Sequence, residues 1–259
     1  MRRAKIDRTG EERVNNFGSK MIISKYNNTH DIDVYFPEYD YTINHVQYGH
    51  FKKGNIKCVC EPRYYGKGYL GIGEYSSCEN GKKTKCYDVW YSMLQRCYDD
   101  KLKEKYPTYK ECRVCEKWCD FQVFSEWFHN NYYEVPGEKM NLDKDILCKG
   151  NKVYSRETCI FVPNRINTLF TQSDKTRGNN PIGVRKISSR TYEVRCRNGY
   201  GKRIYLGTYS TKDEAFGVYK QYKEKIIKET IDSYEGIIPE PHYSRLRDAM
   251  YNYEVEIND

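Results

Sequence analysis

The strongest constraint on the fold is a run of three alternating segments followed by a helix start. The segments span residues 182–186, 192–197 and 202–209, and short connections containing Gly or Ser join them. Such spacing is typical of antiparallel strands joined by tight turns. Thr211, followed by Glu214, forms a capping box, which predicts a helix directly after the third strand. The predicted apolar face of this helix consists of Ala215, Tyr219, Tyr222 and Ile226.

Alternation also predicts which side chains of this sheet face outward, because successive strand residues point to opposite faces. The residues expected to pack on the helix are Val184, Val194, Cys196, Ile204 and Leu206. Residues 181–228 hold 12 Lys and Arg against 4 Asp and Glu, a net charge of +8 that equals the charge of the whole chain. Such a local basic patch is expected of a nucleic-acid-binding surface. The candidate DNA-binding residues are Arg185, Lys186, Arg190, Arg195, Arg197, Lys202, Arg203 and Tyr205.

A three-stranded sheet can lie in the major groove, where arginine bonds guanine. We therefore expect base contacts from Arg195 and Arg203, in mid-strand, and phosphate contacts from Lys186 and Lys202, at strand ends. The alternative is a solvated charged face, although such faces usually mix both signs of charge. Residues 178–259 contain these strands and the helix, so we expect this segment to fold and bind duplex DNA by itself.

The stretch 141–172 predicts a strand, a polar loop, a second strand and a helix. Ile146 and Leu147 end an apolar run, and a short strand resumes near Cys159. Pro163 suits the first position of a helix. On that helix one apolar stripe is expected, formed by Ile166, Leu169 and Phe170, with Asn164 and Asn167 on another face.

This stretch resembles the core of phage HNH (His-Me finger) endonucleases, in which a β-hairpin and a helix surround one divalent metal. Asp143 takes the place of the first motif Asp, and Asn167 that of the helix Asn. Lys144 stands where the general-base His belongs, and Thr158-Cys159 stands where the family has Asn-Leu. The resemblance implies a nuclease with Asp143, Lys144, Asp145 and Asn167 as its catalytic residues, and Asp143 and Asn167 as ligands of Mg²⁺ or Mn²⁺.

Two further segments extend this resemblance. The patterns Trp90 to Tyr98 and Val114 to Phe124 look like the lead-in to the same family, so the similarity covers about residues 85–172. Residues 182–228 resemble the ethylene-response-factor (Apetala-like) DNA-binding domain that such phage endonucleases also carry. The resemblance implies a phage-encoded protein that acts on double-stranded DNA in the cytoplasm of a bacterial host.

Two hypotheses about function stay open because of Lys144. A lysine with an ordinary pKa of ~10.4 cannot accept a proton near neutral pH, so an active nuclease needs another base, either water or His129. The second hypothesis is an inactive nucleic-acid-binding protein. It would act as a regulator, or as an inhibitor of a host-defence nucleoprotein complex such as a CRISPR effector.

The remaining segments complete an α+β organisation. Alternating residues near Ile32 predict a small β module at 1–66, either a barrel or a three-to-four-stranded sheet. Helical spacing from Tyr87 to Cys97 and from Phe121 to Phe128 predicts two helices in an HNH-like domain at 67–172. After it we expect a linker at 173–181, the DNA-binding domain at 182–228 and an acidic tail at 229–259. The tail either packs on the body through its apolar residues or shields the basic sheet.

Other signals carry less weight. Gly66 to Gly71 matches a phosphate-loop spacing, but no strand precedes it and no helix follows, so we expect a flexible turn. His45 and His50 are expected to be surface residues. The 11 cysteines indicate reduced thiols. Cys112 and Cys115 could join two further ligands around zinc, but buried thiols are the favoured interpretation. No apolar run reaches membrane-spanning length.

Overall fold

The computed structural model describes residues 6–170 and 180–257, so most of the expected linker at 173–181 lies outside the described residues. The fold is α+β, with several small antiparallel sheets and helices. The chain divides into two compact units, Met1–Asn130 and Asn131–Asp259. No helix in the described part of the chain is long and apolar enough to cross a membrane.

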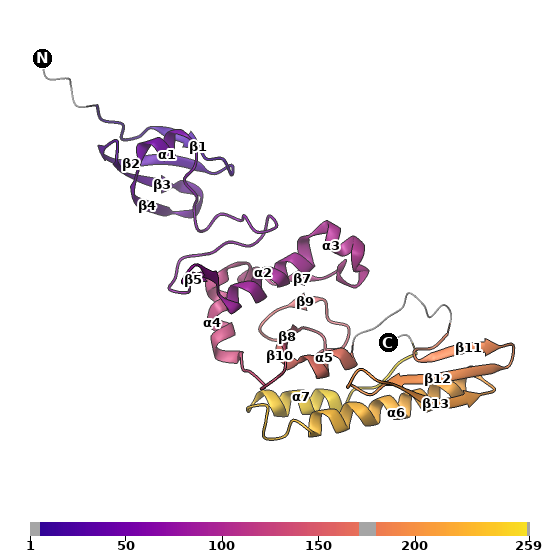
Figure 1. Ribbon diagram of the computed structural model, residues 1–259. Helices are drawn as coiled ribbons and strands as arrows, with labels where there is room; N and C mark the ends of the chain where they lie inside the picture. The colour runs from indigo at the N-terminus through magenta and orange to yellow at the C-terminus, as the bar shows by residue number, and fades with distance from the viewer. Residues whose placement is uncertain (1–5, 171–179, 258–259) are drawn as a thin grey trace, which may run out of the picture. The chain divides into compact units, whose positions relative to one another are not determined.

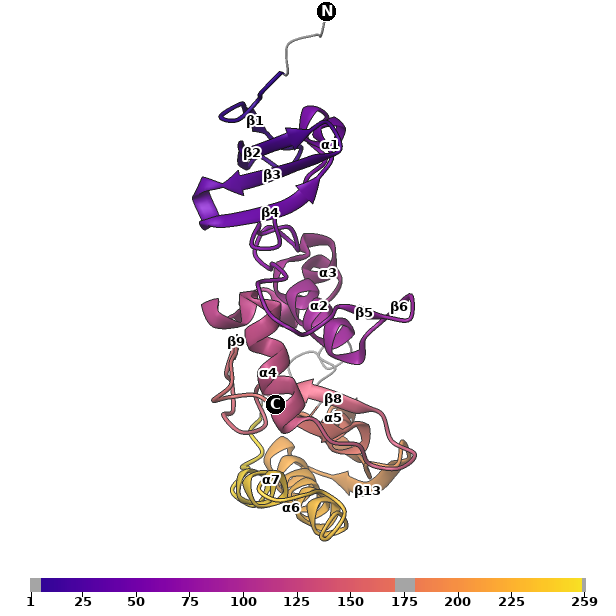
Figure 2. The same cartoon turned by 90° about the vertical axis from the view of Figure 1, so that its left-hand side faces the viewer.

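The first unit begins with a four-stranded antiparallel sheet of order β1-β2-β3-β4 (Figures 1 and 2). Its strands are β1 (Glu12–Val14), β2 (Lys20–Asn28), β3 (Asp31–Phe36) and β4 (Tyr41–Val46). The predicted alternation is confirmed, because every second residue of β3 is buried. The sheet has its own apolar core, formed by Met21, Ile23, Ile32, Val34, Phe36, Phe51, Ile56 and Cys58.

The sequence did not predict α1 (Tyr48–Lys52), which follows this sheet. Its Phe51 is fully buried and extends the core of the sheet. Short helices of this kind lack a repeated apolar stripe, so a periodicity argument overlooks them.

The rest of the first unit is mainly helical. A small hairpin, β5 (Cys78–Glu79) and β6 (Lys82–Lys83), precedes α2 (Lys85–Tyr98). Both predicted helices are present, as α2 and α4 (Phe121–Asn131), and their predicted apolar residues are buried except for Trp127, which is half-buried. The sequence did not predict the β5–β6 hairpin, α3 (Asp100–Lys105) or β7 (Arg113–Val114). It also did not predict the 3-10 turns η1 (Pro37–Tyr39), η2 (Pro107–Tyr109) and η3 (Glu116–Cys119).

The glycine-rich segment before this hairpin is tightly packed, which corrects the expectation of a flexible turn. A Cβ atom on Gly68 would collide with Leu94 and Trp90, and one on Gly71 would collide with the carboxylate of Asp120. Gly71 also has φ +71°, a conformation that favours glycine. These glycines serve close packing, and no helix follows them, as expected.

The second unit begins with the predicted strand, loop, strand and helix. β8 (Met140–Asp143) pairs antiparallel with β10 (Ile160–Pro163), and α5 (Asn164–Leu169) follows directly. The loop between the strands also contains β9 (Val153–Tyr154). The first strand ends at Asp143, earlier than predicted, because the carboxylate of Asp143 caps a turn there.

The predicted three-stranded sheet and helix are also present. The sheet has the order β11-β12-β13 and consists of β11 (Val184–Ser188), β12 (Thr191–Arg197) and β13 (Arg203–Tyr209). The predicted cap is confirmed, since Oγ1 of Thr211 accepts a hydrogen bond of 3.2 Å from the amide of Glu214. Helix α6 (Lys212–Asp232) runs along one face of this sheet, with α7 (His242–Tyr251) beside it (Figure 1).

One apolar core joins all parts of the second unit. It includes Val162 and Ile166 of the β8–β10–α5 segment together with Val194 of the sheet. The sequence analysis placed these residues in separate domains, 67–172 and 182–228. Residues 178–259 therefore lack part of the core on which they pack.

The C-terminal segment belongs to the same core. Ile238, Leu246 and Met250 are buried, which supports packing of the acidic tail rather than a free shield over the basic sheet. Helix α6 also continues past residue 228, where the tail was expected to begin.

Candidate DNA-binding face and nuclease-like site

The outer face of β11–β13 carries the residues that the sequence assigned to DNA binding. All eight of them are exposed. The side chain of Arg185 is 73% exposed and that of Arg195 is 51% exposed, whereas Val184, Val194 and Cys196 are buried beneath them. Arg190 lies in the turn between β11 and β12, and Lys202 lies directly before β13. Lys186 lies in the middle of β11 and pairs with Tyr192, which corrects its expected position at a strand end. The structure thus brings Arg185, Arg195, Arg197, Arg203 and Tyr205 onto one face.

A bulge in β13 decides which of its residues join that face. Val194 is opposite Gly207, but the next residue, Arg195, is opposite Tyr205, so Leu206 is the extra residue. Gly207 has φ +121°, a conformation that side-chain-bearing residues rarely adopt. The shift brings Tyr205 opposite Arg195, with the guanidinium 6.0 Å from the ring centroid.

Glu193 lies among these arginines and was not recognised as part of the surface from the sequence. Its Oε1 lies 3.4 Å from Nε of Arg185 and 3.0 Å from Nε of Arg195, and its Oε2 accepts a 3.0 Å hydrogen bond from Nη2 of Arg195. This hydrogen bond and the nearby guanidinium groups hold the pKa of Glu193 below its usual range. The register could have revealed the contact, because Arg185 is directly opposite Glu193.

The candidate nuclease site begins at the end of β8. Oδ1 of Asp143 accepts hydrogen bonds from the amides of Asp145, at 2.9 Å, and Ile146, at 2.7 Å. Burial, and then the neighbouring charge of Asp145, raise the pKa of Asp143 to about 6. Asp143 thus caps the turn that ends its strand.

Lys144 occupies the position of the expected base, and the structure shows it engaged elsewhere. It is buried, its Nζ lies 2.9 Å from Oδ2 of Asp145, and it lies over the ring of Tyr154 at 5.8 Å. The backbone carbonyl of Lys144 accepts a 2.7 Å hydrogen bond from Asn151. Through these contacts Lys144 holds the loop between β8 and β10 in place.

Asn167 and His129, the other residues connected with catalysis, have different surroundings. Asn167 is half-buried on α5, a helix that contacts β8, the strand bearing Asp143. His129 lies on α4 in the other compact unit, where its ring stacks on Tyr75 at 5.0 Å. The assignments of Asp143, Lys144, Asp145 and Asn167 to catalysis stay predictions.

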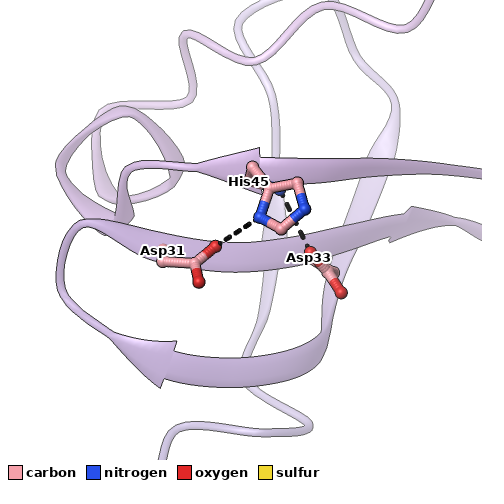
Figure 3. A group of neighbouring side chains, drawn as sticks. All are labelled: Asp31, Asp33 and His45. Carbon is pink, nitrogen blue, oxygen red and sulfur yellow. Dashed lines mark hydrogen bonds and ion pairs between the residues drawn. The ribbon is translucent and has the colours of Figure 1, made fainter.

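A different cluster, on the N-terminal sheet, is the only one in the described ranges where three His, Cys, Asp or Glu ligand atoms lie within 4.8 Å of one another. It consists of Asp31, Asp33 and His45 (Figure 3). Nδ1 of His45 lies 2.9 Å from Oδ1 of Asp31, and the His45 amide donates to Asp33 at 3.1 Å. The contact with His45, followed by that with Asn27, holds the pKa of Asp31 below its usual range.

These hydrogen bonds account for the arrangement of the cluster. The carboxylate of Asp33 accepts the hydrogen bond of the His45 backbone amide, and His45 has φ +58°. The sequence analysis treated His45 only as a surface residue. The missed signal was the alternation of Asp31 and Asp33 on the outer face of β3.

All eleven cysteines are free thiols. Cys112 is buried, and its sulfur lies 3.6 Å from the carbonyl oxygen of Thr108. Cys119 similarly contacts the carbonyl oxygen of Cys115, at 3.8 Å. Cys115 is half-buried, and the zinc site at this pair stays a prediction.

The chain matches no protein-family model, no curated protein and no solved structure. The relationship to HNH endonucleases and to ethylene-response-factor domains therefore stays a resemblance of motifs.

Proposed function

We propose that this protein binds duplex DNA through the outer face of β11–β13. The observation that carries the proposal is the gathering of four arginines and Tyr205 on one exposed sheet face, with Glu193 as the carboxylate among them. Arginine bonds guanine bidentately in the major groove. Lys186 within β11 and Lys202 beside the start of β13 are exposed and suited to phosphate contacts, which fix the register of a protein on DNA.

Glu193 gives this face a property that a general basic patch lacks. It holds the guanidinium of Arg195 through two contacts of 3.0 Å. A guanidinium held in one orientation loses less entropy when it binds a base edge. The arrangement therefore favours sequence-dependent binding.

The test is the affinity of the whole protein for a duplex selected from a random-sequence library. Arg195→Ala and Arg203→Ala should each weaken binding by about 1–3 kcal/mol and relax sequence preference. Lys186→Ala should weaken all sequences alike and reduce the salt slope by about one unit. Arg13→Ala, an exposed arginine on β1 of the other unit, is the matched control.

Unchanged affinity in Arg195→Ala and Arg203→Ala would rule out the sheet as the DNA-binding face. The alternative hypothesis, an inhibitor or regulator that binds a nucleoprotein complex, would then take precedence. The test of this alternative is the affinity of the protein for a purified nucleoprotein effector, measured in place of its affinity for free duplex.

Metal-dependent nicking is a second candidate, favoured by the β8–β10–α5 arrangement. Asp143 ends the first strand of this hairpin, and Asn167 lies on the helix that packs against that strand. Carboxylate and amide oxygens suit Mg²⁺ or Mn²⁺, although one oxygen of Asp143 already accepts two amides. When bound, the metal would stabilise charge on the phosphate.

Nicking of supercoiled plasmid in Mg²⁺ or Mn²⁺ tests this second candidate. Asp143→Asn keeps an oxygen for the turn and removes the charge, so loss of nicking with intact DNA binding would support the site. Lys144→His should raise activity if only the base is missing. Nicking that persists in both Asp143→Asn and Asn167→Ala would refute the assignment.

A further inference from the structure

A cavity of about 680 Å³ lies in the first unit, between the β5–β6 hairpin, the start of α2 and the inner face of α4. Small-molecule sites commonly have volumes of about 300–1,000 Å³. Of the candidate DNA-binding and nuclease residues, His129, the alternative base, is the one that lines it. The cavity still needs an explanation of its own.

One side of the cavity is cationic. Lys82, Lys83 and Lys85 line it beside the N-terminus of α2, a helix of 14 residues. Thr84 caps this helix by accepting the amide of Tyr87 at 3.2 Å. The amides that begin a helix have no acceptor within it, and the helix dipole favours an anion there. Glu74 and Glu79 also line the cavity, so its lysines exceed its carboxylates by one.

The other side of the cavity is aromatic. Phe121 and Phe128 of α4 are buried and form part of the lining. Tyr75 and His129 also line it as a stacked pair, with ring centroids 5.0 Å apart and planes 16° from parallel. His129 is exposed, so the pair is open to a ligand. Nucleobases stack readily on aromatic side chains of this kind.

A buried hydroxyl group also lines the cavity. Ser125 is fully buried, lines the cavity and accepts a hydrogen bond of 3.2 Å from the thiol of Cys86. A serine hydroxyl can donate one hydrogen bond as well as accept, so Ser125 can also donate to an acceptor atom of a ligand.

We propose that this cavity binds a nucleoside phosphate. The phosphate lies at the start of α2 near Lys82 and Lys85, the base packs against the Tyr75–His129 pair, and the hydroxyl of Ser125 donates to the ligand. A base with a phosphate group can come from two sources, a free nucleotide or the 5′-phosphorylated end of a nucleic-acid strand. The proposal is independent of DNA binding by the sheet, which belongs to the other unit.

Calorimetric titration of the whole protein with adenosine 5′-monophosphate tests the site, with adenosine and inorganic phosphate as partial ligands. We expect the nucleotide to bind at least about tenfold more tightly than either part, because each part keeps one set of contacts. Lys82→Ala, Ser125→Ala and His129→Ala should each weaken nucleotide binding by about tenfold. The matched controls are Lys110→Ala and His50→Ala, exposed residues of the same unit outside the cavity.

Single-stranded oligonucleotides of one sequence, with and without a 5′-phosphate, distinguish the two sources. A preference for the phosphorylated strand that Lys82→Ala and His129→Ala abolish assigns the site to strand ends. Binding of the mononucleotide without such a preference assigns it to free nucleotides. Arg195→Ala should not change nucleotide binding, so failure of the sheet proposal would be recognised separately. The proposal is overturned if neither ligand binds, or if the cavity variants bind like the controls.

Discussion

The sheets β1–β4 and β11–β13 are both antiparallel, and each places one face on an apolar core. Their exposed faces differ in charge. On the N-terminal sheet the carboxylates of Asp31 and Asp33 lie on the outer face and contact the ring and the backbone amide of His45. On the C-terminal sheet the arginines outnumber the carboxylate of Glu193. Similar backbones therefore carry different surfaces, and only the second has the positive excess that DNA requires.

The two sheets also differ in how their cores are completed. The N-terminal sheet packs on residues between Met21 and Cys58, all close to it in the sequence. The C-terminal sheet packs on a core that includes Val162, Ile166 and Leu246. Similar secondary structure thus gives one sheet that has a local core and one that depends on distant segments.

The largest expected effect concerns the folding of fragments. Residues 6–63 should fold alone, because they contain the whole core of the N-terminal sheet. Residues 178–259 should fail to fold, because they lack Val162 and Ile166, whereas 131–259 should fold. Loss of buried aliphatic side chains costs about 2–5 kcal/mol each, which exceeds what a small domain can lose. Amide dispersion in NMR spectra measures the outcome, and a well-dispersed spectrum for 178–259 would refute the shared core.

The next effect concerns the bulge that aligns Tyr205 with Arg195. Gly207→Ala should destabilise the second unit by about 1–3 kcal/mol, because an alanine in that conformation is strained. An added Cβ would also lie 2.9 Å from the hydroxyl oxygen of Tyr209. Gly217→Ala is the matched control in α6, where a Cβ meets nothing within 4 Å. It should stabilise the helix by roughly 0.5–1 kcal/mol.

Thermal unfolding of both glycine variants checks this expectation. Equal stability of Gly207→Ala and the parent protein would mean that the bulge is not needed. The outer face would then have to be described with a different register.

A third prediction concerns Asp143 and the dependence of stability on pH. Its pKa is raised from 3.8 to about 6 by burial and by Asp145. The native state thus binds more protons than the unfolded state between these values, so stability should fall as pH rises through this window and then level off. Asp143→Asn should remove this slope and stabilise the protein at pH 7 by about 1–2 kcal/mol, allowing for partial solvent screening.

Unfolding measured between pH 4 and 8 gives the comparison. Asp145→Asn is the control, because it removes the neighbouring charge and should shift the window toward lower pH. Lower stability of Asp143→Asn at pH 7 would show that the charged carboxylate is needed for the fold.

Much of the local structure followed from the sequence because it depends on nearby residues. Alternation predicted β3 and β12, and helical spacing predicted α2, whose buried residues include Trp90 and Leu94. The shared core could not be predicted this way, because Ile166 and Leu246 are far apart in the sequence and join one core only after folding.

The candidate site shows the same division. The exposure of Arg195 and Arg203 was predicted by the period of a strand. The contacts of Lys144 with Asp145 and Tyr154 were not, because they depend on the path of a loop. Spacing can propose which residues belong to a site, but loop geometry decides what each one contacts.

The smallest expected effect separates charge from orientation on the C-terminal sheet. Glu193→Gln removes the contacts that hold Arg185 and Arg195. It also removes one negative charge, which raises the net charge of the protein by one. Glu229→Gln on α6 changes the net charge by the same amount. The Glu229 carboxylate pairs with Lys225 at 3.6 Å and holds neither of the two arginines. Both variants should bind random duplex slightly more tightly at low salt.

Only Glu193→Gln should reduce the preference for a selected duplex over a random one, because only it frees the two guanidinium groups. In the parent protein this preference should persist at pH 5, since the hydrogen bond from Arg195 holds the pKa of Glu193 below its usual range and keeps the carboxylate charged. Competition binding with the two duplexes at two salt concentrations measures the effect. If both glutamine variants keep the same preference, the positive charge of the face matters and the orientation of its arginines does not.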